Sequence, residues 1–237
     1  LCDGKDIFAL DGEYRRILGY LPQEFGFYPE FSVHDYLMYN ASIKGMRISI
    51  ARKRVTELLR QVGVAKMQNR KMKKLSGGMK RRAGIAQAML NNPKILILDE
   101  PTAGLDPNER IRFRNLISEL SQDRLVLLST HIVSDIEYIA NQVLLMKDGK
   151  ISHSGTQEEI IQSVPVKVWS CVVANNEVEM WQKQFKVSNM KTLSDGIELR
   201  ILSEKSPHYN AKEETMALED IFLYYFGEKT GDDYDVL

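Results

Sequence analysis

Two adjacent carboxylates follow a short apolar run in the middle of the chain. Residues 95–98 (ILIL) have the composition of a strand covered on both faces, and Asp99 and Glu100 come directly after it. Open α/β sheets bind ligands beyond the carboxyl ends of their strands. Asp99 there suits Mg²⁺, and Glu100 can orient a water for attack on a phosphoryl group. The alternative is a pair of solvated acids at a strand end.

A segment with two glycines, residues 75–79 (LSGGM), is the second candidate site. Ser76 suits the N-cap of a helix that ends near Leu90. Gly77 and Gly78 allow backbone amides to approach a phosphate at the positive end of that helix. The segment therefore has the form of an anion site, and the alternative is an ordinary glycine-containing turn with a serine cap.

Alternating strands and helices must position these two segments. The chain has a strand pattern at 16–22, where proline ends it, and a second apolar strand pattern at 125–128. Helical spacing of apolar residues is found at 33–44, 51–62, 108–120 and 132–140. This order predicts an α/β fold with a mostly parallel sheet, into which a helical subdomain of about residues 31–90 is inserted.

The pattern changes after about Ile161. Strands are predicted at 166–173 and 197–202, and helices at 177–185 and 215–226, while 143–146 and 150–153 form a hairpin through Asp148-Gly149. We therefore expect an α/β core at 1–161 and a small C-terminal α+β appendage at 162–237.

Composition excludes several classes of protein. Lys plus Arg and Asp plus Glu each total 32, so no overall field favours nucleic acid, and none is expected as a partner. Cys2 and Cys171, the only cysteines, lack metal-ligand or CxxC spacing, which fits a reducing cytoplasm. No apolar run approaches the roughly 18–20 residues of a transmembrane helix. If the protein serves transport, we expect the membrane-spanning part to be another polypeptide.

The order of the motifs is more specific than any one of them. Gln23 follows a predicted strand, the helical subdomain leads to LSGGM, ILILDE is followed by Asp106, and His131 follows the next strand. In this order, over about residues 3–156, the sequence resembles the ABC-type ATPase family. That family has a glutamine loop, a helical subdomain, the LSGGQ signature, a Walker B strand with a catalytic glutamate, an aspartate-containing loop and a switch histidine.

The resemblance implies a P-loop NTPase-like core that binds ATP and Mg²⁺. In the chain's own site, Asp99 is expected to hold Mg²⁺ and Glu100 to act as general base. Gln23 is expected to touch both Mg²⁺ and the attacking water and to sense the membrane partner, and His131 to contact the γ-phosphate.

The signature is implied to serve a different nucleotide. Within LSGGM, which begins at Leu75, Ser76, Gly77 and Gly78 are expected to hold the γ-phosphate bound by a second copy in a head-to-tail dimer. Asp106 is expected to communicate across that dimer.

Two departures from the family pattern matter. Met79 stands where the signature usually has glutamine, which leaves the Ser-Gly-Gly contacts available. No GxxxxGK[ST] motif occurs, and Gly149-Lys150 is followed by Ile151. That motif supplies the backbone amides and lysine that cradle the β- and γ-phosphates. We expect it to precede Leu1, so that the chain is truncated at its N-terminus and inactive alone.

The leading functional hypothesis is an ATP-hydrolysing motor subunit of an ABC transporter. It is expected to act as an exporter with a separate polytopic membrane permease, bound peripherally at the cytoplasmic face of the cell membrane. One alternative is a soluble ABC-type ATPase that works on DNA or ribosomes. Another is a non-hydrolysing regulator that uses its signature face to complete a partner's site.

Overall fold

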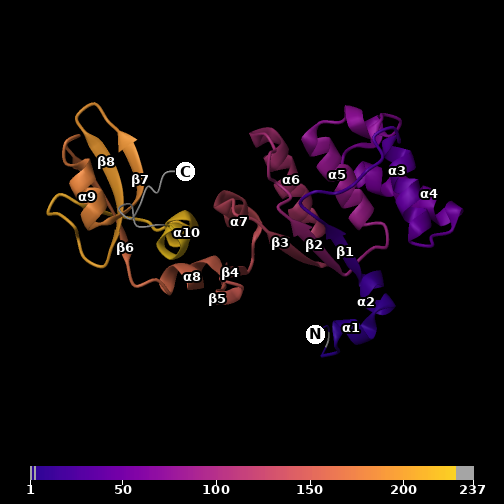
Figure 1. The fold of residues 1–237 in the computed structure, drawn as a ribbon, viewed down its shortest axis with the longest axis horizontal. Coiled ribbons are helices and arrows are strands. Elements are labelled where there is room, and N and C mark those ends of the chain that lie inside the picture. The colour runs from indigo at the N-terminus through magenta and orange to yellow at the C-terminus, as the bar shows by residue number, and fades with distance from the viewer. Residues whose placement is uncertain (1, 3, 228–237) are drawn as a thin grey trace, which may run out of the picture. The chain divides into compact units, whose positions relative to one another are not determined.

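The structure is a computed structural model that describes Cys2 and residues 4–227. The chain divides into two compact units, Leu1–Ile132 and Val133–Leu237 (Figure 1). The predicted α/β class with a parallel sheet is confirmed in the first unit.

A three-stranded parallel sheet forms the centre of the first unit. Its strands are β1 (Leu18–Leu21), β2 (Ile95–Asp99) and β3 (Leu125–Ser129), in the order β1-β2-β3. In register, Leu21 pairs with Leu98, and Leu98 with Leu128. The carboxyl ends of all three strands therefore lie at one edge of the sheet.

Helices fill most of the sequence between β1 and β2. They are α3 (Val33–Ile43), α4 (Ile48–Gln61) and α5 (Gly77–Ala88), with short 3₁₀ turns at Ala65–Met67 and Met72–Lys74. α6 (Pro107–Leu120) then connects β2 to β3. α5 packs directly on β1, because a Cβ at Gly84 would lie 2.7 Å from Leu21 Cδ1.

The start of the chain differs from the prediction. α1 (Ile7–Leu10) and α2 (Gly12–Ile17) were not predicted, and α2 takes up the beginning of the expected strand at 16–22. Asp11 occupies the N-cap position of α2, which begins at Gly12. The strand is shorter than expected because helical backbone continues to Ile17.

The two faces of the parallel sheet are covered differently. Leu21, Leu96 and Leu98 are buried on the face that packs against helices. On the other face, Tyr20, Ile97 and Leu127 are in register, and 48% of Tyr20 and 48% of Leu127 are exposed. Leu125, two residues before Leu127 on the same strand, is 64% exposed. Parallel sheets are normally covered on both faces. This apolar face is thus open within the residues that the structure describes.

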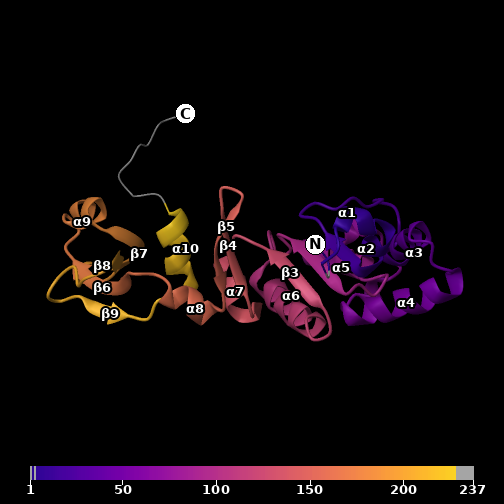
Figure 2. The same ribbon diagram turned by 90° about the horizontal axis from the view of Figure 1, so that it is seen from below.

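The second unit combines a hairpin, a four-stranded antiparallel sheet and four helices in its described part (Figure 2). The hairpin joins β4 (Val143–Lys147) and β5 (Lys150–Gly155), as predicted. The sheet has the order β7-β8-β6-β9, and its strands are β6 (Lys167–Val173), β7 (Lys186–Thr192), β8 (Ile197–Ser203) and β9 (Lys212–Glu214). The helices are α7 (Val133–Ile139), α8 (Gln157–Gln162), α9 (Val178–Gln184) and α10 (Leu218–Phe226).

One hydrophobic cluster explains why this unit begins at Val133. Val143 of the hairpin and Ile160 of α8 pack in the same buried cluster as Leu218 and Ile221 of α10. The compact division therefore falls earlier than residue 161, since helix α10 returns to the hairpin. The functional boundary between 1–161 and 162–237 stays a prediction.

Candidate functional site

The carboxyl ends of β2 and β3 are joined by side-chain hydrogen bonds. The Ser129 hydroxyl donates to Asp99 Oδ1 at 2.6 Å, and the Glu100 amide donates to the Ser129 carbonyl at 3.0 Å. The His131 amide donates to Glu100 Oε1 at 3.1 Å, and His131 Nδ1 lies 2.8 Å from the same oxygen. Three of the predicted site residues, Asp99, Glu100 and His131, are therefore in one small network.

Glu100 has an unusual backbone and an unsatisfied oxygen. Its φ is +43°, in the left-handed region that ordinary residues rarely adopt. Its side chain is only 17% exposed, and Oε2 is buried without a hydrogen-bond partner among the described residues. Strained backbone is held only where the surroundings demand it, often at functional sites. The free oxygen can accept a proton or a hydrogen bond from a water.

Gln23 lies at the same edge of the sheet. It comes two residues after Leu21, Glu100 comes two residues after Leu98, and these two leucines are paired. Gln23 is exposed. The parallel register therefore brings Gln23, Glu100 and the end of β3 to neighbouring positions, as the glutamine-loop prediction requires, while the role of Gln23 stays a prediction.

Arg81 adds a cation that the sequence did not single out. Its Nη1 donates to the Pro22 carbonyl at 3.3 Å, directly before Gln23. Burial lowers the pKa of Arg81, and the carboxylates of Asp99 and Glu24 partly oppose this effect. A positive charge from α5 thus acts on the strand edge that holds Asp99.

The predicted anion segment begins a helix, as expected. Ser76 is the N-cap of α5, and its hydroxyl accepts the Met79 amide at 3.3 Å, while Leu75 is buried. Gly77 faces open space. A Cβ on Gly78 would lie 2.3 Å from Glu109 Oε2, so a side chain at Gly78 would collide with the first turn of α6. The serine-capped turn is present, and phosphate binding at it stays a prediction.

Asp106 has a local role in the chain. Its side chain caps α6 by accepting the Glu109 amide at 2.9 Å, and Pro107 occupies the first turn. Glu109 in turn forms ion pairs with Arg82 at 3.2 Å and Arg112 at 2.9 Å. Asp106 therefore fixes the start of the helix against which the signature glycines pack. Communication across a dimer stays a prediction.

The donor atoms at the strand edge fit Mg²⁺ as a partial set. Asp99 and Gln23 supply oxygen donors, which hard cations prefer. Among the described residues, no group of three or more His, Cys, Asp or Glu side chains could hold a metal alone. Mg²⁺ commonly keeps water and substrate phosphate ligands with only one or two carboxylates. Asp99 with Gln23 is therefore suited to a magnesium–nucleotide complex rather than to an isolated ion.

Sequence reasoning missed Ser129, Arg81 and Glu109. Ser129 could have been found, because it ends the apolar run at 125–128 as Asp99 ends the run at 95–98. Arg81 is one of eight Lys or Arg residues between 66 and 82, and nothing in the sequence distinguishes it from the others. Glu109 has no sequence signal, since its contact with Gly78 depends on the packing of α5 against α6.

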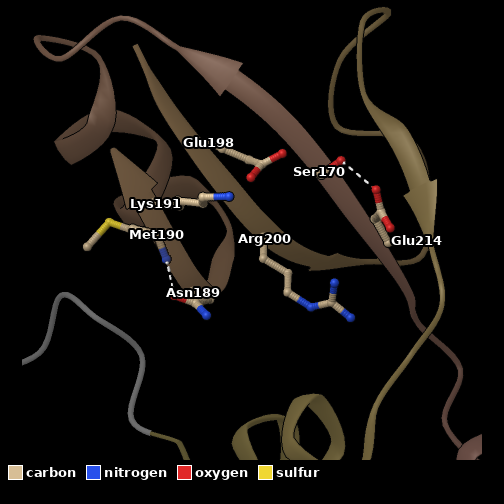
Figure 3. Close-up of a pocket in the computed structure, with 7 residues that line it drawn as sticks. All are labelled: Ser170, Asn189, Met190, Lys191, Glu198, Arg200 and Glu214. Carbon is tan, nitrogen blue, oxygen red and sulfur yellow. Dashed lines mark hydrogen bonds between the residues drawn. The ribbon is translucent and has the colours of Figure 1, made fainter. Parts of the chain in front are cut away.

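A separate hollow of about 270 Å³ lies on the polar face of the antiparallel sheet (Figure 3). Its main cation, Arg200, is already engaged, because Nε and Nη2 donate to Asp220 at 2.9 and 2.7 Å. Ser170 donates to Glu214 at 3.1 Å. None of the predicted site residues is found here. The lining consists of Ser170, Asn189, Met190, Lys191, Glu198, Arg200 and Glu214.

Among the described residues, no helix is both long and apolar enough to cross a membrane.

Known proteins resemble this chain along most of its length. Residues 1–103 match the family described as "ABC transporter". The uncharacterized ABC transporter ATP-binding protein YxlF of Bacillus subtilis is 36% identical over 170 residues, which cover 72% of this chain and 57% of YxlF. The probable multidrug ABC transporter ATP-binding protein YbhF of Escherichia coli is 27% identical, over 94% of this chain and 41% of YbhF.

A solved structure of an ATP-binding subunit of an ABC transporter has the same fold. Its TM-score is 0.57 at 27% identity, and the match covers 68% of this chain and 67% of that one. The chain spans about half the length of the two curated relatives above. Together with the ordered motifs and the network at Asp99, Glu100 and His131, these matches show that the chain contains an ABC-type ATPase domain, similar to those of ABC transporter ATP-binding proteins.

Proposed function

We propose that the complete polypeptide is the ATP-hydrolysing motor subunit of an ABC exporter. It binds ATP with Mg²⁺, pairs head to tail with a second copy, and acts on a separate polytopic membrane permease. It works at the cytoplasmic face of the cell membrane as a peripheral subunit. Export is favoured by the resemblance to YbhF, whose name describes a probable multidrug ABC transporter.

The observation that carries this proposal is the hydrogen-bonded strand edge. Glu100 accepts the His131 amide through Oε1, which leaves the buried Oε2 free to take a proton from an attacking water. Asp99 is held by the Ser129 hydroxyl and is the carboxylate for Mg²⁺. Mg²⁺ and ATP supply the reacting phosphates and their charge neutralisation when they are bound. The protein's own part is to orient water and to stabilise charge.

The signature supports the two-copy arrangement. Ser76 and Gly77 are exposed at the positive end of α5, a twelve-residue helix, and Gly77 leaves open space for an anion. We propose that Ser76, Gly77 and Gly78 hold the γ-phosphate of the nucleotide bound by the other copy. We also propose that Asp106 communicates between the two nucleotide sites across the dimer.

The open apolar face of the parallel sheet is a surface on which a segment with a phosphate loop can pack. Tyr20, Leu125 and Leu127 are exposed there, and the 237 residues contain no GxxxxGK[ST] motif. We propose that this face packs against an apolar helix of a further segment that carries the phosphate loop. We also propose that these 237 residues alone do not hydrolyse ATP.

The test is ATP hydrolysis by the complete polypeptide reconstituted with its permease in lipid vesicles. We expect activity that requires Mg²⁺ and is inhibited by vanadate. The same preparation with Glu100→Gln should bind ATP and lose hydrolysis. Absence of vanadate-sensitive hydrolysis in the wild-type complex would refute the motor function.

One observation favours a second candidate function. Because the phosphate-loop motif is absent from these residues, the chain could serve as a non-hydrolysing regulator that uses its signature to complete a partner's site. Nucleotide titration of the complete polypeptide separates this candidate from the motor, because only the motor binds ATP in its own site. Tight ATP binding by the 237-residue chain alone would contradict both the regulator and the proposal that the phosphate loop lies in a further segment. A soluble ATPase that acts on DNA or ribosomes would instead show hydrolysis stimulated by those partners without the permease.

A further inference from the structure

Three isoleucines are exposed where α3 gives way to α4. Ile43 is 66% exposed, Ile48 65% and Ile50 55%. Single exposed apolar side chains are ordinary, but three within eight residues form a patch, and such patches mark interaction sites. The buried face of α4 is formed by other residues, Ala51, Val55, Leu58 and Leu59. The core of the helical subdomain therefore does not need these isoleucines.

The same segment is strongly basic, although the chain as a whole carries no net charge. Residues 36–56 contain five Lys or Arg and no Asp or Glu. Four of the five are Lys44, Arg47, Arg52 and Lys53. In the described part of the chain, no ion pair joins any of these four to a carboxylate. Their charge is thus available to a partner. α4, which carries two of them, runs along one edge of the first unit (Figure 2).

A hollow of about 490 Å³ lies beside Ile50. Burial lowers the pKa of Lys44 in its wall, so this cation is partly desolvated and would gain from an anion. Arg54 is already engaged, because its Nη2 donates to the Met89 carbonyl at 2.9 Å and its Nη1 pairs with Glu57 at 2.9 Å. The lining combines cations, amides and apolar groups, namely Arg16, Lys44, Met46, Ile50, Arg54, Leu90, Asn91 and Asn92.

We propose that this patch, residues 43–54 with the adjoining hollow, binds the surface of an anionic phospholipid bilayer. The isoleucines enter the interfacial region, and the cations contact headgroup phosphates. Lys44 offers its ammonium group to a phosphate at the hollow, with Met46 and Leu90 beside the acyl part of the lipid. Basic residues next to exposed aliphatic ones are the combination that interfacial binding uses.

A bilayer fits these observations better than an acidic protein segment does. Ile43 ends α3, and Ile48 and Ile50 lie in the first turn of α4, so the three isoleucines come from two helix ends rather than from one groove that a helix could fill. Each of them is more than half exposed, as residues that insert from a projecting segment must be. The proposal goes beyond ATP hydrolysis and does not depend on it.

The experiment is vesicle flotation of the complete polypeptide without permease or nucleotide. One set of vesicles is phosphatidylcholine alone, and the other contains about one-third phosphatidylglycerol, an anionic lipid that basic segments recognise. We expect binding only to the anionic vesicles, and we expect it to weaken at high salt. The double variant Arg47→Ser/Lys53→Ser should lower partitioning about 30-fold, since each basic residue near the surface contributes about fivefold. Ile48→Ser/Ile50→Ser should lower it at least tenfold.

Matched controls separate this surface from general charge and apolarity. Lys150→Ser/Lys205→Ser removes two exposed cations of the second unit, and Ile111→Ser removes an isoleucine that is 49% exposed on α6. Both controls should bind like the wild type. Equal binding by all variants, with circular dichroism unchanged, would overturn the proposal. The proposal would also be overturned if the patch variants kept their vesicle binding but lost association with the permease, because the patch would then face a protein. Hydrolysis in the permease complex reports separately on the motor function.

Discussion

Replacement of Glu100 by Gln tests the proposed chemistry most directly. The amide keeps the shape of the side chain, and its oxygen can still accept the His131 amide that lies 3.1 Å from Oε1. What disappears is the base, because an amide cannot take the proton of the attacking water. General-base catalysis typically contributes about 10²- to 10⁴-fold to the rate. The hydrolysis rate of the variant should fall by about that factor, because the activation free energy rises by about 3–5 kcal/mol.

The structure also limits the cost to folding. The new NH₂ group occupies the position of Oε2, which is buried without a partner, so the variant loses about 1–3 kcal/mol of stability at most. The assay is steady-state phosphate release with the permease, beside ATP binding at equilibrium. Glu119→Gln, an exposed carboxylate of α6, is the matched control. Hydrolysis by the Glu100 variant within threefold of the wild type would refute the assignment of the general base.

Three further outcomes concern stability and titration. Gly78→Ala should destabilise the protein by about 1–3 kcal/mol in chemical denaturation, because its Cβ would meet Glu109, whereas Gly77→Ala, which faces open space, should not. Asp220→Ala should destabilise the second unit by about 3–5 kcal/mol, because Arg200 would lose its bidentate partner. Burial raises the pKa of Asp220, but hydrogen bonds from Arg200, the Ala217 amide and Ser188, together with the charge of Arg200, outweigh it and lower the net pKa. The wild type should therefore keep this stabilisation above about pH 4 and lose it as the pH falls further. Burial raises the pKa of Tyr36 to about 12, so its phenolate should be absent from ultraviolet titration at pH 11 in the folded protein, and its contribution to stability should be lost as the pH rises from about 10 through 12.

Local patterns in the sequence located most elements of the first unit. Residues 33–44 and 95–98 correspond to α3 and β2 because their periodicity and apolar composition agree with the final packing. β7 escaped prediction because Lys186–Thr192 is polar and mostly exposed on its outer residues, so its strand conformation depends on pairing with β8. α1 and α2 lack an apolar stripe long enough to recognise.

The family and the candidate residues could be predicted from local chemistry, because Gln23, LSGGM, ILILDE, Asp106 and His131 occur in a characteristic order along the chain. Their contacts with one another depend on the packing of the strands. Parallel register brings the ends of β1, β2 and β3 to one edge, where Ser129 and His131 hold the two carboxylates. No spacing along the chain encodes those contacts, since residues about 30 positions apart meet only when the strands pair.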